Sequence, residues 1–222
     1  MIEHLHPRIT ENKDWATLLF VLCFAVIAIT KSIYETRFLD FSRLIFSDKY
    51  AKIYRDSNHI KSGFTICLFF IQIISFAFFV QLTLSSFGYA SKTDWQLYIQ
   101  IVTLLAFFIL SKYLIEKIIA TSFNIEEFNE HFNLQKVSYR AYIGFLILPI
   151  NAILFYYDGV SKNVLLIILA ISLCISLFSY FISIKNYQNA ILSKLFYFIL
   201  YLCTLEIAPY YFIYYWFTKQ GA

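Results

Sequence analysis

Residues 63–87 read GFTICLFFIQIISFAFFVQLTLSSF and contain no Asp, Glu, Lys, Arg or His. An α-helix rises about 1.5 Å per residue, so a run of this length crosses a hydrocarbon core of about 30 Å. In a helix the backbone polar groups bond one another, as they must in lipid. This stretch therefore predicts a transmembrane helix.

Five further apolar stretches are also long enough to predict transmembrane helices, and they cover residues 15–33, 95–120, 141–157, 163–184 and 195–217. Of the 222 residues, 60% are hydrophobic and 14% are charged, whereas soluble domains carry about 25% charged residues. Five Gly and three Pro leave little material for the many turns of a closed β-barrel. We therefore expect an all-α, polytopic membrane protein with about six transmembrane helices, in a single domain over residues 1–222.

Lys and Arg residues collect on one side of these predicted spans. Thirteen of the 18 lie in the first, third and fifth connections, and the other five lie on the opposite side. Under the positive-inside rule the basic side is cytoplasmic, so both termini are expected in the periplasm. Trp15, Trp95 and Trp216 fall at the periplasmic ends of their spans, where indole rings favour the membrane–water interface.

Residues 34–60 form the longest connection and mix charges with large apolar side chains. A helical repeat gathers the apolar residues on one stripe, which comprises Tyr34, Phe38, Phe41 and Ile45. Arg37 is expected away from this stripe. The pattern predicts a cytoplasmic amphipathic helix in the headgroup layer, with its basic residues near anionic lipid. A loop helix packed on the bundle needs the same stripe, so both alternatives stay open.

Glu206 is the residue most out of place in an apolar span. It is the only charged residue between Lys194 and Lys219, near the middle of the last span. A carboxylate at that depth requires a partner, a polar cavity or a bound proton, which makes Glu206 a candidate binding or proton-relay residue. Pro209 has no backbone N–H to donate and predicts a helix break beside it.

Polar residues of other spans are expected at the depth of Glu206. The span directions place Asn151, Gln72 and Ser176 there, as further binding or proton-relay candidates. Pro149 predicts a second helix break close to Asn151. Alternatively, these polar side chains form interhelical hydrogen bonds that hold the bundle together, each contributing about 1 kcal/mol.

The cytoplasmic ends of the third and fourth spans carry both signs of charge. Lys112 and Glu116 lie one helical turn apart and are expected to pair locally. The connection at residues 121–139 is acidic and is expected to form a solvated loop helix that ends where the fourth span begins.

The sequence offers no catalytic constellation. It contains no phosphate-binding loop, hydrolase elbow or zinc-protease motif, so we expect no catalytic residue, cofactor or metal site. The four cysteines lie in apolar stretches without CxxC spacing, which indicates small buried side chains. The basic residues flank apolar spans and form no continuous basic face, which argues against a nucleic-acid partner.

Several stretches resemble a family of small bacterial inner-membrane proteins known only as a domain of unknown function. The resemblance rests on residues 12–15, on the aromatic and basic connection that follows the first span, on Leu148 and Pro149, and above all on residues 201–209, which read YLCTLEIAP. Its most specific part is the Leu-Cys-Thr-Leu-Glu-Ile-x-Pro string. The resemblance covers nearly the whole chain. It implies a multi-span protein of a Gram-negative inner membrane, and it implies no activity or substrate.

Three functions fit these features. The first is an accessory or scaffold protein of the cell envelope that lies in the lipid bilayer and contacts a membrane-protein partner or a second copy of itself. The second is a small transporter or proton-coupled permease using Glu206, which would act as an oligomer because six spans without a repeat are few for a lone carrier. The third is a membrane enzyme acting on a lipid or polyprenyl substrate. The enzyme ranks last, because such enzymes usually carry clustered acidic, His or Arg motifs at the membrane surface, whereas the acidic residues of this chain are scattered.

Overall fold

The structure is a computed structural model that describes residues 13–44, 50, 53–54, 62–122, 126–157, 161–186, 211 and 215. Within these residues the chain is all-α and contains six helices. They are α1 (Asp14–Ile33), α2 (Glu35–Ser42), α4 (Gly63–Ser86), α5 (Trp95–Ser122), α6 (Glu126–Tyr156) and α7 (Lys162–Asn186). Four helices are long and apolar enough to cross a membrane: α1, α4, α5 and the part of α6 that begins at Asn133.

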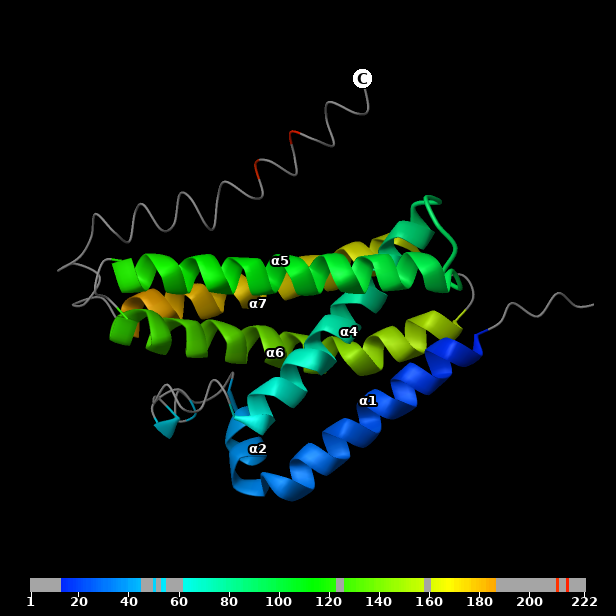
Figure 1. The fold of residues 1–222 in the computed structure, drawn as a ribbon. Helices are drawn as coiled ribbons and strands as arrows, with labels where there is room; N and C mark the ends of the chain where they lie inside the picture. Colours follow the sequence, from blue (N-terminus) through cyan, green and yellow to red (C-terminus); the bar gives the residue numbers. More distant parts are fainter. Residues whose placement is uncertain are drawn as a thin grey trace, which may run out of the picture.

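The long helices run alternately in opposite directions between two ends of the bundle (Figure 1). At the first end, the indole Nε1 of Trp15 in α1 donates to the Thr93 carbonyl just before α5, at 3.3 Å. At the second end, Glu116 of α5 forms an ion pair with Lys136 of α6 at 3.1 Å. We call these the Trp15 end and the Glu116 end. The alternation agrees with the directions expected for the first five spans.

Helix α4 lies at the centre of the bundle and contacts α1, α5, α6 and α7. Its Phe78 side chain is fully buried and meets an aromatic ring from each of three neighbouring helices. These rings belong to Trp15, Tyr98 and Phe155, at centroid distances of 5.8, 4.6 and 5.8 Å. Such aromatic pairs contribute about 0.5–1.5 kcal/mol each beyond their buried area. The cluster therefore joins four helices at the Trp15 end.

Local capping fixes the turn between α4 and α5. Gly88 has a φ of 82°, a left-handed conformation that glycine adopts without a steric penalty. The N–H of Tyr89 donates to the Leu84 carbonyl at 3.0 Å, which is the long bond of a Schellman motif. The Asp94 carboxylate accepts two N–H groups in the first turn of α5, at 3.0 and 3.2 Å, and so caps that helix.

Helix α6 differs most from the sequence prediction. A span at residues 141–157, preceded by a separate loop helix at 121–139, was expected; instead one helix continues from Glu126 to Tyr156. Lys136 and Arg140 interrupt the apolar run, but Lys, Arg, Glu and Gln are good helix formers and do not end a helix. The helix break predicted at Pro149 is also wrong, because α6 continues beyond it to Tyr156. Neighbouring helices make proline tolerable within a membrane helix.

Helix α2 packs against the bundle. Phe38 and Phe41 of the predicted apolar stripe are buried, whereas Ile45 lies outside the described residues. The Phe41 ring lies 5.7 Å from that of Phe64 in α4 and 5.5 Å from that of Tyr142 in α6. These contacts match the alternative of a loop helix packed on the bundle. The location of α2 in a headgroup layer stays a prediction.

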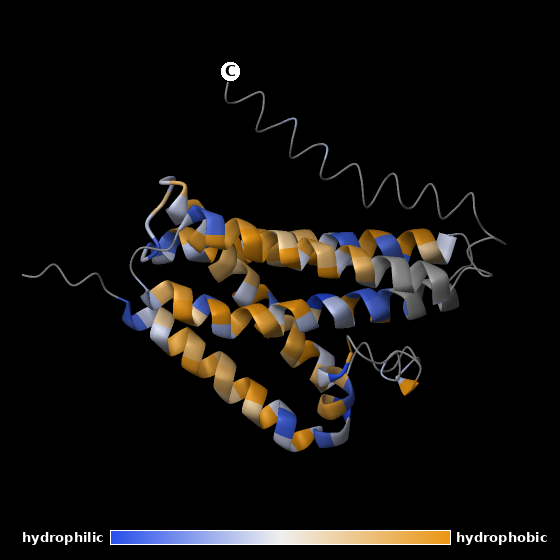
Figure 2. Cartoon of the chain, turned by 180° about the vertical axis from the view of Figure 1, so that it is seen from behind, coloured by the Kyte–Doolittle hydropathy of each residue, from blue (hydrophilic) through white to orange (hydrophobic). Residues whose placement is uncertain are grey.

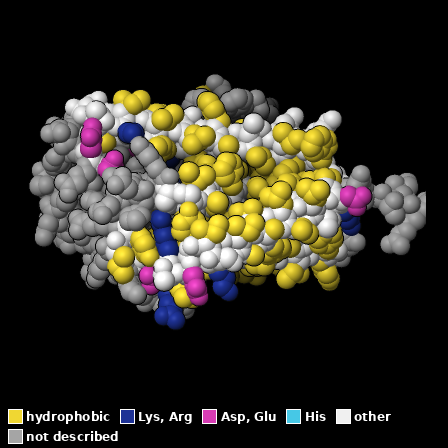
Figure 3. All heavy atoms as spheres, turned by 60° about the horizontal axis from the view of Figure 1, so that its bottom comes forward, with side chains coloured by type: hydrophobic (Ala, Val, Ile, Leu, Met, Phe, Trp, Pro, Cys, Tyr) yellow, Lys and Arg dark blue, Asp and Glu magenta, His cyan; other side chains and the backbone are white. Residues whose placement is uncertain are grey.

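The outer surface of the long helices is apolar between the two ends, as Figure 2 shows along the helices and Figure 3 over one face. Only 6% of the apolar window of α5 is buried, against 50% for α4. A surface of this kind suits lipid or another membrane helix. The sixth predicted span, at residues 195–217, lies outside the described residues apart from Tyr211 and Tyr215. The division into a single domain stays a prediction.

Candidate functional site

Asn151 of α6 is 0% exposed and bonds across the bundle interior to α4. Its Nδ2 donates to the Ser75 carbonyl at 2.7 Å and lies 3.4 Å from the Ser75 hydroxyl. The Oδ1 of Asn151 has no hydrogen-bond partner among the described residues. Asn151 therefore links α6 to α4 through its amide N–H group, and its amide oxygen is a buried acceptor without a partner among the described residues.

Gln72 of α4 lies in the same interface, against Gly144 of α6. A Cβ atom added to Gly144 would stand 2.8 Å from the Cα of Gln72 and 3.1 Å from its Cβ, so only glycine permits this close approach. The Gln72 side chain is 1% exposed, and within the described part of the chain its Nε2 has no hydrogen-bond partner. The α4–α6 interface thus contains an unsatisfied donor and an unsatisfied acceptor.

The structure brings together two of the four predicted binding or proton-relay residues. Asn151 and Gln72 share the α4–α6 interface, whereas Ser176 is exposed on α7 and donates to the Ser172 carbonyl of its own helix at 2.9 Å. Glu206 and Pro209 lie outside the described residues. The layer of four polar residues therefore stays a prediction.

Arg37 of α2 is a buried cation that the sequence pattern missed. Its guanidinium donates to the hydroxyls of Ser62 at 2.7 Å, Thr65 at 3.2 Å and Tyr50 at 3.4 Å. It also lies 4.6 Å from the centroid of the Phe64 ring. Charge-assisted hydrogen bonds and cation–π contacts both strengthen when water is excluded, and Arg37 is only 6% exposed. These contacts anchor α2 to the start of α4.

The expectation that Arg37 lies away from the apolar stripe is wrong for a geometric reason. An α-helix turns about 100° per residue, so Arg37 stands only about 40° from Phe41 around α2. The long apolar stem of arginine further allows burial along such an edge. A stricter helical projection would have placed Arg37 at the border of the stripe.

Tyr50 completes this cluster and is itself buried. Burial raises the pKa of Tyr50 above its usual value, and the positive charge of Arg37 offsets part of that effect. Tyr50 therefore stays a neutral hydroxyl that accepts from the guanidinium. The cluster therefore holds the positive charge of Arg37 in a fixed position, which is a structural role.

A protein-family model covers most of the chain. Residues 16–217 match the family model described as Domain of unknown function (DUF4271). The chain belongs to the DUF4271 family. Searches of curated proteins and of solved structures give no match. Together with four helices that are able to span a membrane, DUF4271 membership fits an integral membrane protein, and the family description assigns it no activity.

In this DUF4271 chain, an ion pair between α5 and α6 was also not expected from the sequence. Glu116 was predicted to pair locally with Lys112; the structure shows its carboxylate in an ion pair with Lys136 of α6, where the Glu116 side chain is 4% exposed and that of Lys136 9%. Helical spacing indicates only neighbours within one helix. A contact between helices depends on how α5 and α6 pack, which no local pattern contains.

Proposed function

We propose that the chain is a multi-pass protein of a bacterial inner membrane that serves as an accessory or scaffold subunit of a cell-envelope assembly. The observation that carries this proposal is the contrast between the closed α4–α6 interface and helix α5, most of which no described residue covers. In the interface, Gly144 lets the two backbones touch and Asn151 bonds directly to α4. Buried polar groups used in this way hold helices together.

Helix α5 supplies a surface for a partner. Its large apolar side chains remain exposed at Leu104 (68%), Phe107 (75%), Leu114 (56%) and Ile118 (65%). These positions lie on one side of the helix, because their spacing follows the helical repeat. Such a face meets either acyl chains or another membrane helix. The accessory function assigns it to a membrane-protein partner or to a second copy of the chain.

The distribution of basic residues supports an orientation. Thirteen of the 18 Lys and Arg residues lie on the side of the predicted spans that corresponds to the Glu116 end. The positive-inside rule therefore favours a cytoplasmic Glu116 end, a periplasmic Trp15 end and two periplasmic termini. Helix α2 and its Arg37 anchor would then lie on the cytoplasmic side.

Site-specific photocrosslinking in cells tests the accessory function. A benzophenone amino acid at Phe107 is expected to give a discrete adduct with one membrane protein, and Ile118 is expected to give the same adduct. Ile153, which is 70% exposed on α6, is the matched control and is expected to give no such adduct. An adduct of twice the chain's mass assigns the face to a second copy. The absence of a protein adduct at both α5 positions contradicts the proposal.

A small transporter or proton-coupled permease using Glu206 is the second candidate. The observation that favours it is the unsatisfied pair of atoms in the interior, Gln72 Nε2 and Asn151 Oδ1. Buried polar groups without a partner call for a water, an ion or a solute to satisfy them. For this function, Glu206→Gln abolishes proton-coupled uptake while expression and folding persist. Full uptake by that variant, alongside a wild-type control, rejects the transporter.

A further inference from the structure

Gln100 of α5 is an exposed amide within an apolar span. It lies five residues, or about 7.5 Å along the helix, from Trp95, the first residue of α5. The Gln100 side chain has no hydrogen bond to any residue that the structure describes. Acyl chains offer neither a donor nor an acceptor, so an amide at this depth is costly unless another membrane helix pairs with it.

Gln100 begins a regular stripe along α5, whose members follow at spacings of four, three, four, three and four residues. We call it the Gln100 stripe, and it comprises Gln100, Leu104, Phe107, Ser111, Leu114 and Ile118. At about 100° per residue, all six positions fall within a sector about 80° wide. Five of them are exposed, and Ser111 is half-buried. Alternate spacings of three and four are those of a coiled-coil seam, along which two helices pack.

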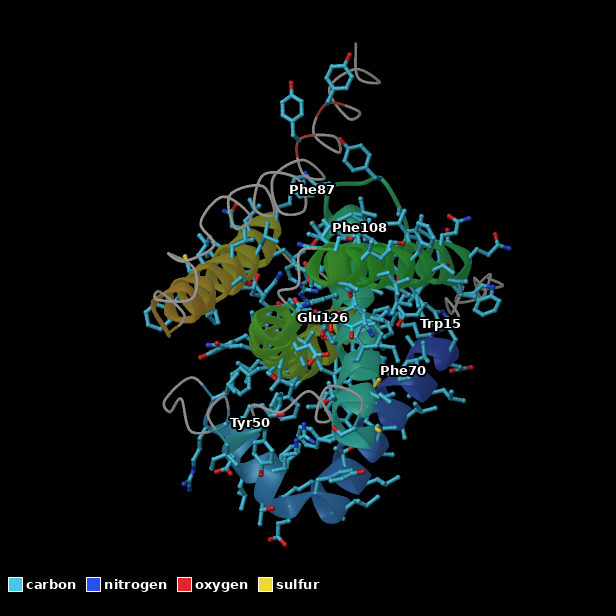
Figure 4. All side chains as sticks on the ribbon, turned by 60° about the vertical axis from the view of Figure 1, so that its left-hand side comes forward. Trp15, Tyr50, Phe70, Phe87, Phe108 and Glu126 are labelled. Atoms are coloured by element: carbon cyan, nitrogen blue, oxygen red, sulfur yellow. The ribbon has the colours of Figure 1, made fainter. Side chains whose placement is uncertain are left out.

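The stripe lies on the side of α5 that faces away from the bundle. The buried residues of α5 are Tyr98, Glu116 and Ala120, and each stands about 160° around the helix from Gln100. In Figure 4, α5 carries the labelled Phe108 and lies at the edge of the bundle opposite α2. The packing of α5 against its described neighbours therefore leaves the Gln100 stripe open to a further occupant.

The exposed apolar surface of the stripe is large enough for a specific interface. Its four large apolar residues, Leu104, Phe107, Leu114 and Ile118, are 68%, 75%, 56% and 65% exposed. A fully exposed residue of this size offers about 200 Å², so the four together offer about 500 Å² in each chain. Two such surfaces would bury about 1,000 Å² in total, which is the area that specific protein interfaces need.

The amide of Gln100 favours a second copy of the chain over other occupants. A primary amide has both donors and an acceptor, so it is complementary to an identical amide. In a dimer whose twofold axis is perpendicular to the membrane, the two α5 helices run parallel and their Gln100 side chains meet at one depth. Each Nε2 then donates to the Oε1 of the other copy, which satisfies both amides without a further residue. A polar residue at one position of an apolar seam also fixes the register of the two helices.

We propose that the Gln100 stripe is the interface of a parallel homodimer. Its large apolar side chains interdigitate with their counterparts, and the small side chain of Ser111 lets the two backbones approach near the middle of the seam. This inference rests on the proposed function, whose partner surface on α5 it assigns to a second copy. A different membrane protein on this face would reject the homodimer and retain the accessory function.

Disulfide crosslinking in isolated membranes tests the interface, in a chain whose four native cysteines are replaced. Leu104→Cys and Ser111→Cys are expected to give a disulfide-linked dimer on mild oxidation, because both positions face the second copy across the seam. Leu110→Cys is the matched control. Leu110 lies at the depth of Ser111 and is 49% exposed, but it stands about 100° around the helix and is expected to crosslink about tenfold less. Equal crosslinking at Leu110 and Ser111, or none at either stripe position, overturns the homodimer.

Variants of Gln100 separate the amide pair from the apolar packing. Energy transfer between labelled chains, measured as the vesicles are diluted with lipid, gives the affinity of the dimer. Gln100→Leu removes two hydrogen bonds between helices and should weaken the dimer about tenfold, and Gln100→Asn should retain part of the affinity. Gln96→Leu is the matched control, because it removes an exposed amide one turn closer to the helix end, where water can replace a partner. It should leave the affinity unchanged.

The outcomes separate a failure of the homodimer from a failure of the accessory function. A dimer that Gln100→Leu weakens no more than Gln96→Leu contradicts the amide pair and with it the proposed interface. A chain that stays monomeric in vesicles, yet forms an adduct at Phe107 with a different membrane protein in cells, rejects only the homodimer. A monomeric chain without any protein adduct at Phe107 and Ile118 shows that no partner covers this face, which rejects both.

Discussion

The substitution Gly144→Ala tests how closely α6 packs against α4. Its new methyl group would stand 2.8 Å from the Cα of Gln72, while ordinary contacts begin at 3.4 Å, so α4 and α6 must separate by about 0.6 Å. The opposing atoms belong to the backbone and the first side-chain carbons of Gln72, which cannot rotate away. Overpacking of this kind costs about 3 kcal/mol, and the helix propensity of alanine returns about 1 kcal/mol. We expect a net loss of about 2 kcal/mol.

Unfolding by SDS titration in mixed micelles measures this loss, with helix content followed by circular dichroism. Gly63→Ala is the matched control, because its new methyl group meets only the movable hydroxyl of Tyr34, at 3.0 Å. We expect that variant to unfold within about 0.5 kcal/mol of the wild type. An unchanged or raised free energy of unfolding for Gly144→Ala, or equal losses in the two variants, refutes the close α4–α6 contact.

Three further changes probe the buried polar groups by the same titration. Asn151→Ala removes the bond to the Ser75 carbonyl and should cost about 1 kcal/mol; a loss no different from that of an exposed substitution argues against that bond. Arg37→Met removes charge-assisted bonds to Ser62 and Thr65 and should cost about 2 kcal/mol, whereas an unaltered stability shows that α2 is held otherwise. Burial raises the pKa of Tyr50 above 10.0, so the neutral form favours folding, and stability should fall as the pH rises above about 10. Tyr50→Phe should lessen that fall, and an identical pH profile contradicts the assignment.

The sequence predicts the long helices well because their cause is local. Residues 63–87 lack any charge, and the helix found there, Gly63–Ser86, ends at a glycine turn that a local cap explains. The start of α6 was missed for a local reason as well. A count of uncharged residues places the start of the fourth span after Arg140. The helix itself begins earlier, at Glu126, because charged residues such as Lys136 and Arg140 do not interrupt an α-helix.

The polar contacts between helices could be predicted only in part. Asn151 and Gln72 were selected by their depth in the spans, and both lie in the α4–α6 interface. The bond from Asn151 to Ser75 and the close approach of Gly144 depend on the rotation of each helix about its axis, which apolar spans with little amphipathic character leave open. Arg37 could have been found by projection around α2, since its angular position is fixed by the sequence alone.

The central claim is that the bundle crosses a membrane with its Glu116 end in the cytoplasm. The direct measurement is cysteine labelling by a membrane-impermeant maleimide in spheroplasts, in a chain whose four native cysteines are replaced. Tyr89→Cys, at the Trp15 end and 81% exposed in the wild type, is expected to react in closed spheroplasts. Glu35→Cys, exposed at the start of α2, is expected to react only after the membrane is opened. Labelling of Glu35→Cys in closed spheroplasts, with or without labelling of Tyr89→Cys, contradicts the orientation.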